Sequence, residues 1–244
     1  MKIKLILAIL FFSSCFAKCS SQQKAADSKP KTGADYTYAT ATDGGIGKFY
    51  LGRQISYVMG AEGSDWLERD DRNKEENTNL AIERIPLQPN AVVADIGAGT
   101  GYYSFKIAVK VPQGKVYAVD IQDEMISMLQ KKKAQLKDSI IEVVKSTAQS
   151  PNLPANSTDL AIMVDVYHEL EYPHEMLQAI RKVLKPAGKI LLIEYRGEDA
   201  SIPIKPLHKT TVAQLNKEME ANGFKLNYRG EFLPIQHFLI YEKM

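Results

Sequence analysis

The fold of this chain is decided by the stretch Val92-Val93-Ala94-Asp95-Ile96-Gly97-Ala98-Gly99-Thr100-Gly101-Tyr102. The apolar run through Asp95 predicts a buried strand, and the glycines after it predict a tight turn into a helix. Such a turn lets a ligand approach the backbone at a helix N-terminus. Dinucleotide sites space their glycines as G-x-G-x-x-G, whereas the third glycine here is Gly101 and Tyr102 occupies the later position. With no pyrophosphate to seat, the loop carries Asp95, whose negative charge favours a cationic ligand.

A second acidic residue ends the next predicted strand. Residues 115–120 form an apolar run that closes on Asp120. In nucleotide-binding α/β folds, a carboxylate at this place accepts hydrogen bonds from the ribose hydroxyls. Ile121 follows directly and is placed to pack against an adenine ring. Three glycines could simply form an ordinary turn between a strand and a helix. Their position after a buried strand, together with Asp95 and Asp120, instead indicates a nucleoside-binding site.

Short apolar runs alternate with helical periodicity from residue 91 onward. This pattern predicts strands over 91–96, 115–120, 140–144, 160–164 and 190–195, and helices over 101–110, 123–137, 176–184 and 211–221. The last two runs, 224–230 and 237–242, are too close in sequence for a helical crossover, so we expect them to pair antiparallel. The predicted fold class is α/β, with a Rossmann-like seven-stranded, mostly parallel sheet, one antiparallel strand and helices on both faces.

The N-terminus reads as a targeting signal. Two lysines precede the apolar run over 5–12, and small residues follow, which predicts a signal peptide over 1–19. The sequence Phe12-Ser13-Ser14-Cys15 resembles a bacterial lipoprotein signal, in which an acylated cysteine becomes the new N-terminus, and Cys19 is a second candidate. Simple secretion after cleavage at Ala17 is the alternative. The expected location is the periplasm or cell envelope with membrane attachment through the acylated cysteine, or the cytoplasm if the signal is not functional.

Two segments separate this signal from the α/β domain. Residues 20–45 contain almost no large apolar side chains, which predicts a flexible linker. Residues 46–90 are expected to form an N-terminal helical segment, with one helix over 64–85. The middle of that helix is so polar that it is either a solvated face or a lid over the site. The α/β domain itself takes residues 91–244.

From about residue 75 to 244 the chain resembles the class I S-adenosylmethionine-dependent methyltransferases. The resemblance is carried by four motifs: residues 92–102, Val116–Ile121, Leu153-Pro154 with Ser157–Met163, and Val183–Lys189. It implies that S-adenosyl-L-methionine is the cofactor and is held by Asp95, Gly97, Gly99, Gly101 and Asp120.

The resemblance also implies an adenine contact in the loop after the third strand. Many members of the family have an Asp-Ala pair there, whereas this chain reads Ser146-Thr147-Ala148-Gln149-Ser150. Ala148 and Gln149 are therefore the expected contacts, without an acidic side chain. The segments Trp66–Arg69 and Val166–Glu169 further resemble a bacterial subgroup of uncharacterised methyltransferases.

The expected chemistry directs attention to the end of the fourth strand. Methyl transfer from a sulfonium is an in-line displacement, so the protein must orient the acceptor and, where needed, remove its proton. Tyr167 and His168 lie just past that strand, at the edge where ligands bind in such folds. They are the candidate catalytic residues, with His168 a possible general base. The alternative role for His168 is a structural hydrogen bond or a place in the cofactor pocket wall.

Composition narrows the choice of partner. Among 244 residues, 31 basic side chains balance 29 acidic ones, which gives no reason to expect nucleic-acid binding. No metal site is expected, because the other histidines, His174, His208 and His237, are scattered in sequence. The predicted function is S-adenosylmethionine-dependent methyl transfer to a small-molecule acceptor. The alternative is an exported, non-catalytic module on the same fold that binds a nucleoside-like ligand or a partner.

Overall fold

The computed structural model describes residues 36–244. The expected signal over residues 1–19, with Cys15 and Cys19, and most of the expected linker lie outside the described residues. Within residues 36–244, none of the helices has the length and apolar character needed to cross a membrane.

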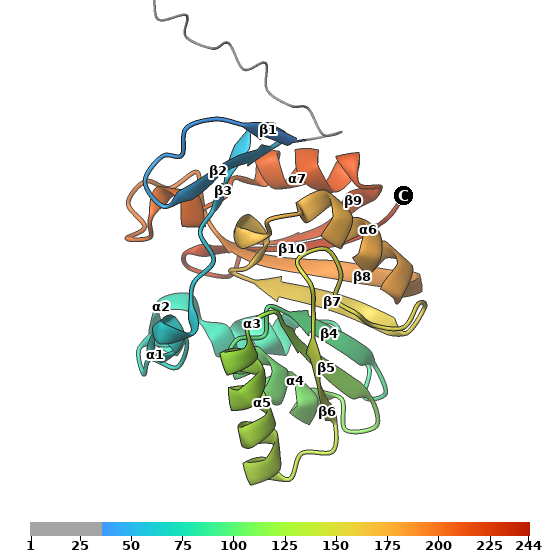
Figure 1. Ribbon diagram of the computed structural model, residues 1–244. Helices are drawn as coiled ribbons and strands as arrows, with labels where there is room; N and C mark the ends of the chain where they lie inside the picture. Colours follow the sequence, from blue (N-terminus) through green and yellow to red (C-terminus); the bar gives the residue numbers. More distant parts are fainter. Residues whose placement is uncertain (1–35) are drawn as a thin grey trace, which may run out of the picture.

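A seven-stranded sheet forms the centre of the molecule, in the order β6-β5-β4-β7-β8-β10-β9 (Figure 1). Its strands are β4 (Val92–Ile96), β5 (Lys115–Asp120), β6 (Ile141–Lys145), β7 (Thr158–Val164), β8 (Leu184–Tyr195), β9 (Phe224–Gly230) and β10 (Gln236–Lys243). Strand β10 is antiparallel to both of its neighbours, and the other pairs are parallel. The predicted sheet with one reversed strand is therefore confirmed.

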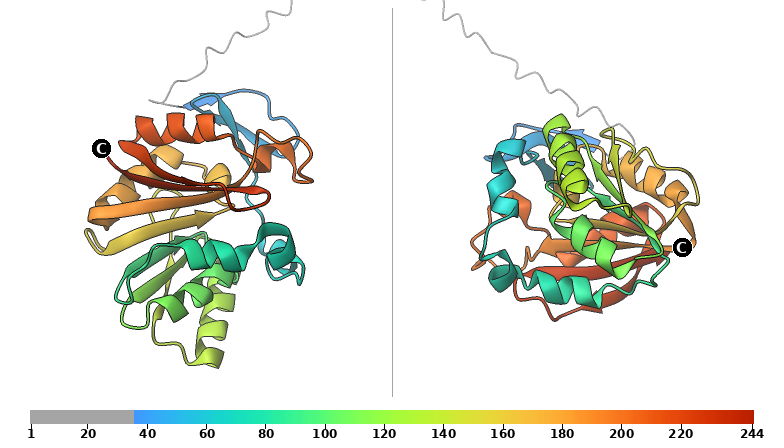
Figure 2. Two further views of the ribbon diagram at one scale, coloured as in Figure 1. Left: turned by 180° about the vertical axis from the view of Figure 1, so that it is seen from behind. Right: turned by 90° about the horizontal axis from the view of Figure 1, so that it is seen from below.

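Helices cover both faces of this sheet because each strand alternates its apolar side chains between two cores. In β7, Leu160 and Ile162 face one core, whereas Ala161 and Met163 face the other. The first core is completed by α3 (Thr78–Arg84), α4 (Tyr102–Lys110) and α5 (Asp123–Leu136). The second is completed by α6 (Pro173–Val183) and α7 (Val212–Ala221). Figure 2 shows α4 and α5 in green on the opposite side of the sheet from α7 in orange.

The region before residue 91 differs from the prediction. It contains a three-stranded antiparallel sheet made of β1 (Tyr36–Tyr38), β2 (Gly45–Tyr50) and β3 (Arg53–Ser56). Strand β1 lies inside the range 20–45 that was expected to be a linker. It is ordered because the ring of Tyr36 packs against Tyr50, with 5.3 Å between the ring centroids.

The single helix expected over 64–85 is also wrong, because this range holds three short helices. They are α1 (Ser64–Leu67), α2 (Arg72–Glu76) and α3, and a 3-10 turn, η1 (Ala61–Gly63), precedes them. Asn77 separates α2 from α3 with a left-handed φ of 56°. The polar middle of the range is only partly solvated, since Arg72 and Glu76 are 4% and 1% exposed. They are buried because they pair with each other, with Arg72 Nε 3.0 Å from Glu76 Oε2.

The small sheet is fixed to the α/β domain through contacts between β3 and α7. Arg53 of β3 donates hydrogen bonds to both carboxylate oxygens of Glu218 on α7, at 2.7 and 2.8 Å. The same guanidinium donates to the backbone carbonyl of His168 at 3.0 Å. Figure 1 shows the small sheet next to α7. Arg53 thereby fixes the 3-10 turn η2 (Tyr167–Glu169), which holds the candidate catalytic residues.

Candidate active site

A cavity of about 660 Å³ opens at the carboxyl ends of β4, β5 and β7. This is the edge where ligands bind in open α/β sheets, and the volume is in the range of about 300–1,000 Å³ found for small-molecule pockets. One wall comes from the segment over residues 57–72, which includes Trp66 and Leu67. Of the polar residues 68–79, the part considered as a lid, only Arg72 lines the cavity, and the wall is built mainly from residues 57–67.

The glycine loop forms the floor of the cavity through Gly97 and Gly99, whereas Gly101, which was also expected to hold the cofactor, does not line it. Gly97, Gly99 and Gly101 have left-handed φ values of 74°, 55° and 82°, which side chains other than glycine rarely adopt. The backbone N–H groups of Gly97 and Ala98 both donate to the carbonyl oxygen of Val119, at 2.8 and 2.9 Å. These bonds tie the turn after β4 to the end of β5, so the loop presents its backbone to the cavity in a fixed shape.

Asp120 stands at the end of β5 and is only 4% exposed. Its Oδ2 accepts a hydrogen bond from the backbone N–H of Gly99, and its Oδ1 accepts one from the N–H of Gln122, both at 2.9 Å. Burial raises the pKa of this carboxyl above its usual value, although these backbone bonds oppose the shift. Ile121 lies next to it in the cavity wall and is 43% exposed, so its apolar side chain is accessible to a ligand. The structure thus brings together the acid and the apolar surface that the sequence predicts.

Asp95 lies beneath the glycine loop and also lines the cavity. Its Oδ2 accepts a hydrogen bond of 2.6 Å from the hydroxyl of Ser104 on α4. Burial raises the pKa of Asp95 from its usual value near 3.8 to about 6; the Ser104 bond opposes the shift and nearby Asp120 adds to it. The Asp95 carboxylate is therefore protonated already at mildly acidic pH. It lies next to the place expected for a positively charged ligand.

The loop after β6 contributes in part as predicted. Ser146, Thr147 and Ala148 line the cavity. Gln149 does not line it; this residue is exposed, and its backbone N–H donates to the Thr147 hydroxyl at 3.3 Å. The expected contact from Gln149 is therefore not supported by its position.

The two candidate catalytic residues point in different directions from η2. Tyr167 is fully buried in the core shared with α6 and α7, and its hydroxyl donates to Glu218 at 2.8 Å. It does not line the cavity, so the expected contact between Tyr167 and the acceptor is contradicted by the structure. In a tight 3-10 turn, successive side chains diverge, and of the two candidates only His168 lines the cavity.

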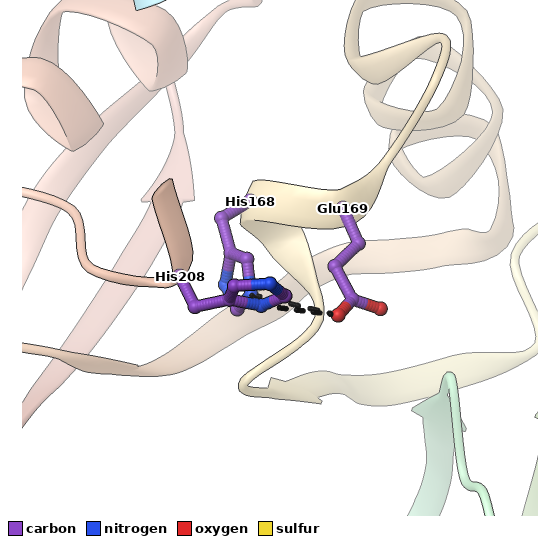
Figure 3. A group of neighbouring side chains, drawn as sticks. All are labelled: His168, Glu169 and His208. Atoms are coloured by element: carbon purple, nitrogen blue, oxygen red, sulfur yellow. Dashed lines mark hydrogen bonds and ion pairs between the residues drawn. The ribbon is translucent and has the colours of Figure 1, made fainter. Parts of the chain in front are cut away.

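His168 is held by partners on both ring nitrogens. Its Nδ1 lies 2.6 Å from Glu194 Oε2 on β8, and its Nε2 lies 3.0 Å from Nδ1 of His208 (Figure 3). Burial lowers the pKa of His168, but the neighbouring carboxylate of Glu194 outweighs it, so the pKa lies above its usual value. Because both nitrogens are engaged, His168 can take a proton from an acceptor only if His208 moves or relays it.

His208 and Glu169 complete this cluster and were not expected as site residues. His208 belongs to the 3-10 turn η3 (Pro206–His208), and its Nδ1 lies 3.4 Å from Glu169 Oε1. All three side chains line the cavity. The sequence places His208 far from His168, and only the course of the chain after β8 brings the two rings together.

Three polar atoms in the cavity wall have no hydrogen-bond partner among residues 36–244: the Thr100 hydroxyl, the Tyr103 hydroxyl and Oδ1 of Asp165. Asp165 follows β7 with a left-handed φ of 54°, and its other oxygen accepts a bond of 2.7 Å from Gln236. Burial, reinforced by Glu76 and Glu194, raises the pKa of Asp165 well above its usual value. Buried polar atoms without partners are uncommon, and here all three belong to residues that line the cavity.

Comparisons with known proteins agree with this fold. The sequence family described as "Methyltransferase domain" matches residues 94–192. Among solved structures, a SAM dependent methyltransferase from Aquifex aeolicus is similar, with a TM-score of 0.72 and 23% identity, covering 77% of this chain and 100% of that one. The fold of this chain is thus the Rossmann-like architecture seen in that methyltransferase.

Two curated relatives align over part of their length. The ubiquinone/menaquinone biosynthesis C-methyltransferase UbiE of Hahella chejuensis is 32% identical over 121 residues, which are 48% of this chain and 47% of the relative. The demethylmenaquinone methyltransferase of Oceanobacillus iheyensis is 28% identical over 114 residues, 46% of this chain and 48% of the relative. The chain therefore spans about half the length of these relatives.

Proposed function

We propose that this protein transfers a methyl group from S-adenosyl-L-methionine to a small-molecule acceptor. The observation that carries the proposal is the glycine loop with Asp120 at the floor of the cavity. The match to a methyltransferase domain over residues 94–192 supports it. The relatives' names refer to demethylmenaquinone and to ubiquinone/menaquinone biosynthesis, which supports a small-molecule acceptor.

The residues in the cavity fit the cofactor. A Cβ on Gly99 would lie 2.7 Å from Leu67 Cδ1, so the loop leaves the floor open only because it carries glycine. The carboxylate of Asp120 would accept hydrogen bonds from the ribose hydroxyls, and Ile121 would pack against the adenine. Asp95 supplies negative charge for the cationic part of the donor. When bound, the cofactor supplies an activated methyl group on a positively charged sulfur.

The remaining wall is suited to a small acceptor. His168, Glu169 and His208 provide polar contacts at one part of the cavity, and Asp165 adds a buried carboxyl. Trp66 and Leu67 enclose the other side, which reduces the access of water to the reacting groups. The main contribution of this site to the rate of methyl transfer would come from holding donor and acceptor close together in a reactive orientation.

Transfer from a labelled donor tests the proposal. Full chain incubated with methyl-labelled S-adenosylmethionine and a fractionated bacterial extract is expected to label a small-molecule fraction. Asp120→Asn is expected to reduce this labelling, whereas Asp123→Ala, an exposed acid on α5 outside the cavity wall, is expected to leave it unchanged. Labelling of the protein or nucleic-acid fractions alone, or donor binding without any transfer, contradicts the proposal; the latter result favours the non-catalytic binding module.

We further propose that the chain is exported and anchored through an acylated Cys15 or Cys19. The support is the signal-like sequence at residues 1–19. Cell fractionation with labelled fatty acid tests it: label is expected in the membrane fraction and is expected to be lost in Cys15→Ser or Cys19→Ser. An unlabelled chain of full length in the cytoplasmic fraction overturns this proposal and leaves the methyltransferase proposal intact.

A further inference from the structure

The side chains of His168, Glu169 and His208 converge at one point of the cavity wall (Figure 3). Their candidate ligand atoms lie within 4.8 Å of one another. We propose that these three side chains bind a divalent transition-metal ion, with Zn²⁺ as the reference ion. Two imidazole nitrogens and one carboxylate oxygen, with a further position open, form a donor set that zinc uses in catalytic sites.

The spacing of the three atoms matches a coordination polyhedron. His168 Nε2 lies 3.0 Å from His208 Nδ1, His208 Nδ1 lies 3.4 Å from Glu169 Oε1, and His168 Nε2 lies 3.8 Å from that oxygen. Ligands at about 2.0–2.1 Å from zinc in a tetrahedron are separated from each other by about 3.3–3.4 Å. The three observed distances lie below, at and above this separation, so an ion fits between the three atoms after shifts of a few tenths of an ångström.

A fourth residue orients the most deeply buried ligand. Glu194 is fully buried and lies 2.6 Å from Nδ1 of His168. A carboxylate that accepts the Nδ1 proton fixes the imidazole tautomer and leaves Nε2 with its lone pair, as in the carboxylate–histidine–metal arrangement of known sites. The backbone carbonyl of His168 is in turn held by Arg53. The ring is therefore preorganised for a ligand at Nε2.

The open coordination position of the ion would face the cavity, where the methyl acceptor binds. The acceptor would then be a molecule that can coordinate the ion, an inference that rests on the proposed function. A hydroxyl or thiol bound to a divalent ion releases its proton to solvent at a lower pH than the free group. The resulting oxygen or sulfur attacks the methyl group of the donor. As the new bond to carbon forms, the sulfonium S–CH₃ bond breaks and its electron pair remains on the donor sulfur.

Calorimetry with Zn²⁺ alone tests the metal site without donor or acceptor. The tag-free full chain, stripped with a chelator, is expected to bind one equivalent. His208→Ala and Glu169→Gln are expected to lose saturable binding, and Glu194→Gln to weaken it by about 10–100-fold. His208 is partly exposed and its removal spares the core; His174→Ala, another partly exposed histidine outside the cavity wall, is the matched control.

The outcomes separate the two proposals. Absence of saturable zinc binding by the wild type, or an equal loss in His174→Ala, overturns the metal site and leaves methyl transfer untouched. A second experiment tests whether the ion has a free coordination position. The visible absorption spectrum of the Co²⁺-loaded chain is recorded before and after catechol is added as a ligand for that position. A spectral change on adding catechol is expected, and an unchanged spectrum overturns the acceptor class.

Discussion

Gly97 and Val166 face each other across the cavity floor so closely that a Cβ on Gly97 would lie 2.6 Å from both γ-carbons of Val166. Gly97 follows β4 and Val166 follows β7, two strands that pair directly in the sheet. The contact therefore joins the loop that forms the proposed donor site to the turn that carries His168.

Gly97→Ala is expected to destabilise the protein in two ways. The left-handed φ of 74° costs an alanine about 1–2 kcal/mol, and the clash with Val166 adds to it. Gly44→Ala is the matched control, because Gly44 has a similar φ of 81° and no heavy atom of residues 36–244 lies within 4 Å of the added carbon. Urea denaturation is expected to show a larger loss for Gly97→Ala than for Gly44→Ala. Equal losses contradict the close contact.

The buried pair of Arg53 and Glu218 is expected to be needed for stability. The two side chains are 9% and 0% exposed, and Tyr167 also donates to this carboxylate. Arg53→Met leaves a buried charge without its ionic partner, which typically costs about 3–5 kcal/mol. The double variant Arg53→Met/Glu218→Gln is expected to recover part of that loss in urea denaturation. A double variant that is no more stable than Arg53→Met argues against the pairing.

Asp95 is expected to make stability and donor binding depend on pH in opposite directions. Its pKa is raised to about 6, so folding favours the protonated form. The contribution of protonated Asp95 to the free energy of unfolding is complete below about pH 3.8 and is lost as the pH rises through about 6. The change is on the order of 3 kcal/mol. A cationic donor favours the carboxylate instead, so its affinity should fall as pH is lowered through about 6.

The variant Asp95→Asn separates this effect from other titrating groups. The groups facing Asp95 are Asp120 on β5, Arg72 on α2 and the Ser104 hydroxyl on α4, and all three remain in the variant. The unfolding free energy of Asp95→Asn relative to wild type is expected to rise between pH 4 and 7, and donor affinity is expected to vary less with pH. Parallel pH profiles for the two proteins speak against this role.

The large sheet was predictable because its signals are local. The apolar runs around β4, β5 and β7 end at the polar or glycine residues that begin each loop, and Asp95 and Asp120 are read from the same short segments. The small sheet was missed because β1 depends on a contact between Tyr36 and Tyr50, and its docking depends on Arg53 finding Glu218. No short window of sequence contains either pairing.

The candidate site also has one part that local sequence predicts and one part that depends on long-range contacts. The donor half is read from two short segments, the glycine loop and the end of β5, and the structure brings Gly97, Gly99 and Asp120 to one cavity, whereas Gly101 does not line it. The other half is assembled from η2, η3 and β8, which bring His168, His208 and Glu194 together across a long stretch of chain. Adjacency in sequence was also misleading for Tyr167, because the 3-10 turn directs it into the core while His168 reaches the cavity.

Calorimetric titration with S-adenosylmethionine tests the central claim most directly. The wild type is expected to bind one equivalent. Asp120→Asn should bind at least about tenfold more weakly, because a charge-assisted hydrogen bond contributes roughly 1.5–3 kcal/mol. The exposed Asp123→Ala on α5 is expected to match the wild type. A wild type that does not bind the donor, or an Asp120→Asn variant that binds it as tightly as the wild type, contradicts the account.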